Sequence, residues 1–195
     1  MKQPITTPQQ RSLTRLSYVG KSTAILAWGL CLVYAVGELY MWICHGEVVL
    51  HGILQALSDS QPLLADPGFT LSKLAIALLF LLDLLPVLIT SLVWLLTGLF
   101  FLRLSQNELW TARNFKLLWA AGILNIISPF VYQLSWTFQS LAVSLDLPSG
   151  EKIFVFSLGL STNGVSEVVV GIILCAFAWM IRESIKIREE NALYI

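Results

Sequence analysis

Three acidic residues lie inside long apolar stretches, where an ionised carboxylate is unfavourable. Glu38, Asp83 and Glu167 stand among aliphatic and aromatic residues, and Asp83 interrupts the segment LLFLLDLLPVLI. An ionised side chain at the centre of a lipid bilayer costs about 2.5–3.5 kcal/mol on insertion scales. Two chemistries remain open for such acids. They can tie helices together through hydrogen bonds, or they can hold a proton or a cation.

The residues around these acids offer hydrogen bonds but no basic partner, because the interiors of the apolar stretches contain no Lys or Arg. A polar stripe spaced 3, 4, 3, 4 shares one helical face and comprises Asn125, Ser128, Tyr132, Ser135 and Gln139. The sequence therefore predicts an intramembrane polar cluster of Glu38, Asp83, Asn125, Tyr132, Ser135 and Glu167. Because a neutral carboxyl group is easier to bury, Asp83 is expected to be protonated and hydrogen-bonded near the third span.

Other reactive patterns are weaker. In the segment CHGEVVLHG, Glu47 and His51 share a helical face, but the spacing matches no established metal-ligand pattern and Gly46 interrupts the geometry. No metal or other cofactor is therefore expected. The sequence also lacks GxSxG, HExxH and a pair of catalytic aspartates in two spans. We accordingly expect no enzymatic activity.

Composition indicates a membrane protein. Of 195 residues, 56% are hydrophobic and 12% are charged, about half the charged fraction of a soluble domain. The formal net charge is zero, which gives no support for direct nucleic-acid binding. Single cysteines at Cys31, Cys44 and Cys175 form no CxxC pair, which disfavours a disulfide-exchange enzyme. The lipid bilayer is thus the first expected partner.

Four apolar runs each exceed the roughly 20 residues that a membrane helix needs. They cover about residues 22–44, 71–102, 115–145 and 160–181. No internal repeat or separate soluble domain is visible, so residues 1–195 are expected to form one domain. The sequence predicts an all-α, polytopic membrane protein with four transmembrane helices. A short amphipathic helix is expected after the first span, because polar residues recur at helical spacing from Glu47 to Ser58.

Basic residues predict the orientation of these spans. One side carries ten Lys and Arg residues: Lys2, Arg11, Arg15, Lys21, Arg103, Arg113, Lys116, Arg182, Lys186 and Arg188. Only Lys73 and Lys152 fall on the other side. The positive-inside rule therefore places both termini in the cytoplasm. Counting from the estimated cytoplasmic ends, the three acids lie at about 24, 28 and 21 Å, which predicts one shared depth.

Two short motifs resemble a known family. The segment NELWTARNFKLL, residues 107–118, resembles the GEPFTxxNxxxL signature of an uncharacterised bacterial four-span membrane family, catalogued as domain of unknown function 2975. The tail IREENALYI, residues 187–195, is similar to that family's LxEENDLTI. Asn107, Trp110, Ala192 and Tyr194 depart from these patterns. The resemblance implies a bacterial cytoplasmic (inner) membrane location and a cytoplasmic regulatory protein as partner.

The first motif also has a local structural role, since Thr111 is placed to cap the third span by accepting from an amide near Arg113 or Asn114. An exposed chain end has no comparable packing demand, so the tail is predicted to contact a partner through Glu189, Glu190 and Asn191.

We therefore expect a membrane-embedded interaction or regulatory module. The alternative is a small proton- or cation-handling transporter or channel subunit that works as a homo-oligomer. Small residues between Gly159 and Gly171 favour close helix packing, with self-association as the lesser alternative.

Overall fold

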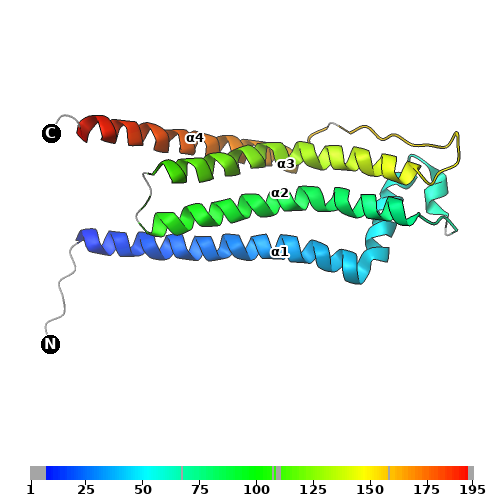
Figure 1. Cartoon of the computed structure of the whole chain (residues 1–195), viewed down its shortest axis with the longest axis horizontal. Coiled ribbons are helices and arrows are strands. Elements are labelled where there is room, and N and C mark those ends of the chain that lie inside the picture. Colours follow the sequence, from blue (N-terminus) through cyan, green and yellow to red (C-terminus); the bar gives the residue numbers. More distant parts are fainter. Residues whose placement is uncertain (1–7, 67, 107, 109–110, 158, 193–195) are drawn as a thin grey trace.

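The computed structural model describes residues 8–66, 68–106, 108, 111–157 and 159–192. Within these residues the chain contains helices and no strand. The elements are α1 (Pro8–Ser58), the short 3-10 helix η1 (Pro62–Ala65), α2 (Lys73–Ser105), α3 (Ala112–Ser144) and α4 (Thr162–Ala192). Four helices are long and apolar enough to cross a membrane, which confirms the predicted fold class (Figure 1).

Each long helix packs mainly against its neighbour in the chain: α1 against α2, α2 against α3, and α3 against α4. The start of α1, the α2–α3 turn and the end of α4 lie together at what we call the terminal end (Figure 1). The opposite, or loop, end carries η1 and the α3–α4 connection. That the terminal end faces the cytoplasm is a prediction from the basic residues.

The helices extend beyond the predicted spans. The second and third contain 33 residues each, about 50 Å, compared with a hydrocarbon core of about 30 Å. The backbone of His45 has non-helical angles (φ −133°, ψ 28°), so α1 is kinked just after the predicted end of the first span, but it continues to Ser58. Beyond the kink, Ile53 and Leu57 are buried while Glu47 is exposed. The predicted amphipathic helix is thereby confirmed.

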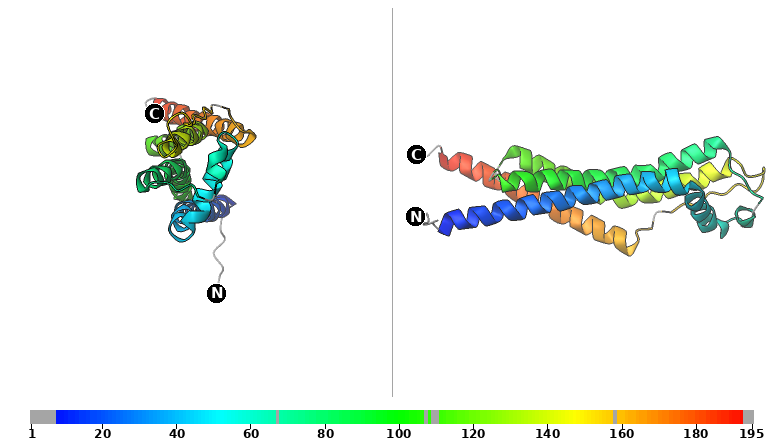
Figure 2. Two further views of the ribbon diagram at one scale, coloured as in Figure 1. Left: turned by 90° about the vertical axis from the view of Figure 1, so that its right-hand side faces the viewer. Right: turned by 90° about the horizontal axis from the view of Figure 1, so that it is seen from below.

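Two glycines let α3 and α4 approach closely. A Cβ atom on Gly122 would lie 2.9 Å from the Gly171 carbonyl oxygen, and one on Gly171 would lie 2.7 Å from that of Gly122. Small residues at such a crossing increase backbone contact. Figure 2 shows that α4 runs obliquely to the other three helices. Of the small residues predicted to favour close packing, Gly171 lies at this crossing, whereas a Cβ atom on Gly159 would meet no atom within 4 Å.

Apolar clusters lie at both ends. At the loop end, the cluster draws buried residues from several elements: Ile53, Leu57, Leu64, Leu79, Ala142, Val143, Leu147 and Ile153. At the terminal end, the cluster comes from α2, α3 and α4 and contains Phe100, Leu118, Ala178 and Ile181. The segment after the α1 kink thus closes the loop end of the molecule.

The connection from α3 to α4 returns along α3 as an extended segment, residues 153–157, which we call the strap. Ser144 Oγ accepts from Ile153 N at 2.9 Å and donates to Ile153 O at 2.6 Å. Val155 N donates to Ser140 Oγ at 3.1 Å, and Ser157 N donates to Thr137 Oγ1 at 3.3 Å. Side chains of α3 therefore supply the hydrogen bonds that a strand partner would otherwise provide.

Candidate functional site

The indole of Trp42 joins two acidic side chains from different helices. Its Nε1 donates to Glu38 Oε1 at 3.1 Å and to Asp83 Oδ2 at 2.9 Å. Gln139 Nε2 on α3 donates to Asp83 Oδ1 at 3.4 Å. Glu38 and Asp83, which we call the acid pair, are thus held by three helices.

Helical spacing explains how these groups meet. Glu38 and Trp42 are four residues apart, so they share the face of α1 that packs on α2. The Trp42 ring also contacts Phe80 edge-on, with centroids 5.4 Å apart and planes at 75°. Phe80 lies three residues before Asp83 and therefore on the same face of α2. Ring packing and the shared N–H donor fix the register of the two helices.

The acid pair has no cationic partner among the described residues. The ion pairs there are Arg103–Glu108 at 3.7 Å and Lys186–Glu183 at 2.8 Å. Asp83 precedes Arg103 by 20 positions, roughly 30 Å along α2, which is the thickness of a hydrocarbon core. The acid pair therefore lies one bilayer thickness from the basic flank at the terminal end.

A cavity of about 270 Å³ adjoins the acid pair between the end of α1, α2 and α3. Its lining includes Asp83, Tyr132, Ser135, Trp136 and Gln139. Ser135 is only 3% exposed, and its Oγ has no hydrogen-bond partner among the described residues. This cavity combines an acid, a buried hydroxyl group and aromatic rings.

A second cavity, of about 350 Å³, lies along the same α2–α3 groove. Polar residues from α2, α3 and the start of α4 dominate its lining: Thr90, Ser128, Tyr132, Gln133, Ser161, Asn163 and Glu167. Tyr132 and Pro86 border both cavities. Since Tyr132 is 60% exposed, its ring lies at their common rim.

The structure brings together only part of the predicted polar cluster. Glu38 meets Asp83, and Ser135 and Tyr132 line the cavity beside Asp83. Asn125 and Glu167 form a separate contact, in which Asn125 Nδ2 donates to the Glu167 backbone oxygen at 3.0 Å. Asn125 precedes Gln139 by 14 residues, roughly 21 Å along α3. The three acids therefore do not share one depth, because α4 crosses the other helices obliquely and brings Glu167 beside Asn125.

Two members of the site were outside the predicted cluster. Trp42 was not assigned to the cluster, and Gln139 belonged to the polar stripe of the third span without being assigned a partner. The spacing of four residues between Glu38 and Trp42 was the available signal. Whether the same indole also reaches Asp83 depends on the register of α1 against α2. Sequence spacing does not specify this register.

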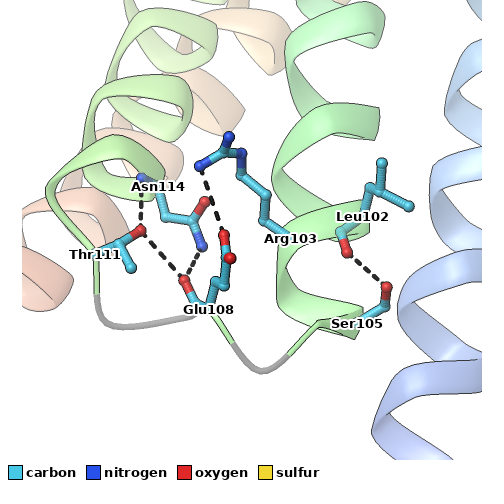
Figure 3. Close-up of polar contacts among 6 residues, drawn as sticks. All are labelled: Leu102, Arg103, Ser105, Glu108, Thr111 and Asn114. Atoms are coloured by element: carbon cyan, nitrogen blue, oxygen red, sulfur yellow. Dashed lines mark hydrogen bonds and ion pairs between the residues drawn. The ribbon is translucent and has the colours of Figure 1, made fainter.

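The α2–α3 turn contains the first family-like motif, and three of its polar residues are bonded to one another within the turn (Figure 3). Thr111 Oγ1 accepts from Asn114 N at 3.3 Å, which confirms the predicted cap. Thr111 Oγ1 and Asn114 Nδ2 also donate to the Glu108 backbone oxygen, at 3.2 and 2.5 Å. Of the motif, Asn107, Leu109 and Trp110 lie outside the described residues. These hydrogen bonds therefore stabilise the turn through contacts within residues 108–114.

The second motif lies at the end of α4, where Glu189, Glu190 and Asn191 are helical and exposed. Residues 193–195 lie outside the described residues. No group of three His, Cys, Asp or Glu residues that could hold a metal occurs in the described part of the chain. Comparisons with protein-family models, curated proteins and solved structures found no match, so the resemblance to the four-span family stays a prediction.

Proposed function

We propose that this protein is a membrane-embedded regulatory module that binds a proton at the acid pair. The shared Trp42 N–H is the observation that carries the proposal, since one donor serves two carboxyl groups from two helices. Two fully ionised carboxylates that share one N–H donor repel one another, whereas one proton bound by the pair relieves this repulsion.

Proton loss would act on helix packing. Without the proton, two negative charges would compete for one indole N–H, and the described basic residues offer no salt bridge at this end of the molecule. The α1–α2 contact near the kink would then loosen. Tyr132 on α3 is the other titratable group that lines the adjoining cavity. A change in proton concentration would thereby become a change in helix packing that a partner could read.

Infrared spectroscopy of the purified protein in detergent tests the proton directly. A carbonyl-stretch band from a protonated carboxyl group should be present at neutral pH and disappear as the pH rises. Glu38→Gln and Asp83→Asn should each remove this band. Glu47→Gln is the matched control, because Glu47 is an exposed acid on the same helix. A spectrum without such a band, or a band unchanged in both acid-pair variants, would refute the proposal.

A second candidate is the binding of a cytoplasmic partner by the tail. It is favoured by the end of α4, which continues as a charged, exposed helix to Ala192. Deletion of residues 189–195 should abolish co-purification of a cytoplasmic protein after crosslinking in native membranes. The control is the double variant Glu183→Gln and Lys186→Gln, which removes an exposed ion pair one turn earlier and leaves the tail intact. Equal recovery of the partner with the deleted chain would exclude this role.

A further inference from the structure

The cavity beside the acid pair carries more than an acidic cluster. Its volume, about 270 Å³, is close to the lower limit of pockets that hold small organic molecules. The post-kink part of α1 forms one wall, through Gly52 among others, and α2 and α3 form the rest. The cavity thus lies where three elements meet and where the α1 kink determines its shape.

An unpaired hydroxyl group points to a ligand. Ser135 is only 3% exposed, and its Oγ has no hydrogen-bond partner among the described residues. Three other hydroxyl groups of α3 are occupied: Thr137, Ser140 and Ser144 bind backbone groups of the helix and of the strap. Buried polar groups are normally paired. The Ser135 hydroxyl is therefore available to a molecule in the cavity.

Charge and ring chemistry select the kind of molecule. With one proton shared, the acid pair keeps one negative charge, which matches a single monovalent cation. An ammonium group is purely a hydrogen-bond donor, and both the Asp83 carboxylate and the Ser135 hydroxyl can accept from it. Tyr132 and Trp136 supply aromatic faces, which attract a cation and cover a hydrocarbon chain. These groups together favour an organic cation over a bare metal ion.

We propose that this cavity binds a small organic ammonium ion, with its nitrogen between Asp83 and Ser135 and its hydrocarbon part against Tyr132 and Trp136. This inference rests on the proposed proton site, because Asp83 belongs to both. It deepens that function by naming a ligand class: an amine that binds in its charged form and biases the packing of α1 on α2.

Isothermal titration calorimetry of the full chain in detergent tests the inference, with butylammonium chloride as the probe. Sodium chloride at equal concentration and uncharged 1-butanol are the ligand controls. The wild type should bind butylammonium saturably and neither control. Ser135→Ala should weaken binding about tenfold, as expected for one lost hydrogen bond to a charged group. Equal heats from sodium chloride or from 1-butanol would overturn the assignment to an organic cation.

A second variant, which fills the cavity with a larger side chain, tests the binding site without removing a polar group. A Cβ atom on Gly52 meets no atom within 4 Å, so Gly52→Leu should fold and occupy the mouth of the cavity. Its binding should fall at least about tenfold. Gly29→Leu is the matched control, since Gly29 is another α1 glycine with open space around it. Wild-type binding in both Gly52→Leu and Ser135→Ala would refute the site.

The two proposals fail separately. Ser135→Ala and Gly52→Leu leave Glu38, Trp42 and Asp83 unchanged, so both variants should keep the protonated-carboxyl infrared band while binding butylammonium more weakly. A band without butylammonium binding in the wild type would refute the ligand and spare the proton site. Binding without the band would refute the proton site, and with it the charge argument for a monovalent cation.

Discussion

The two ends of this molecule use polar side chains in different ways. At the loop end, hydrogen bonds join elements far apart in sequence: Trp42 to Asp83 across 41 positions, and Gln139 to Asp83 across 56. At the terminal end, the α2–α3 turn satisfies itself over six positions, from Glu108 to Asn114. The loop end therefore depends on correct helix register, whereas the turn can form locally. Long-range polar contacts are also where a bound proton or ligand can change the packing.

The largest effect is expected from the glycine crossing in the half nearer the terminal end. Gly122→Val places a Cβ atom 2.6 Å from Cys175 Sγ and 2.9 Å from the Gly171 carbonyl oxygen. Because one of these neighbours is backbone, we expect a loss of about 3 kcal/mol in the free energy of unfolding. Titration with a denaturing detergent, followed by circular dichroism, measures it.

Gly29→Val is the control for that substitution, because a Cβ atom at Gly29 has no atom within 4 Å. Valine has a higher helix propensity than glycine, so this control should unfold no earlier than the wild type. If the two variants were equally stable, close packing of α3 on α4 would not hold the terminal half together.

The strap tests the loop end. Ser144→Ala removes the hydroxyl that binds both the amide and the carbonyl of Ile153, which is only 8% exposed. Two buried backbone groups lose a partner, and we expect a loss of about 2 kcal/mol and faster proteolysis within the strap. Ser184→Ala is the control, since the Ser184 hydroxyl binds only the Met180 carbonyl of its own helix at an exposed position. Equal stability would show that the strap contributes little.

The contrast between local and long-range hydrogen bonds also explains which features the sequence could predict. The Thr111 cap follows from a local pattern, and this prediction agrees with the structure. The shared N–H of Trp42 does not, because it requires the register of α1 on α2. The depth of Glu167 was misjudged because the count assumed that α4 runs parallel to the other helices, whereas α4 crosses them obliquely.

The strap was missed for a related reason. Gln133, Thr137, Ser140 and Ser144 recur at spacings of 4, 3 and 4, a pattern as regular as the predicted stripe. Sequence spacing showed that they share a face. It did not show that their partner is an extended backbone segment returning along α3, since this depends on where the chain goes after Ser144.

A smaller effect is expected in the turn. Thr111→Ala removes the hydroxyl that accepts from Asn114 N and donates to Glu108 O. Loss of an N-cap typically costs about 1 kcal/mol, so the free energy of unfolding should fall by that amount. Thr23→Ala is a suitable control, because the Thr23 hydroxyl binds only the Val19 carbonyl of its own helix. A loss above that of Ser144→Ala would reverse the ranking of the two ends.

The smallest effect is expected from a substitution that distinguishes the Glu108 backbone oxygen from the Glu108 carboxylate. Glu108→Gln keeps the backbone oxygen that accepts from Thr111 and Asn114, and removes only the ion pair with Arg103 at 3.7 Å. The Glu108 side chain is 49% exposed, so water and salt screen this pair. We expect a change below about 0.5 kcal/mol that vanishes in high salt. A loss equal to that of Thr111→Ala would mean that the carboxylate, and not the backbone acceptor, holds the turn.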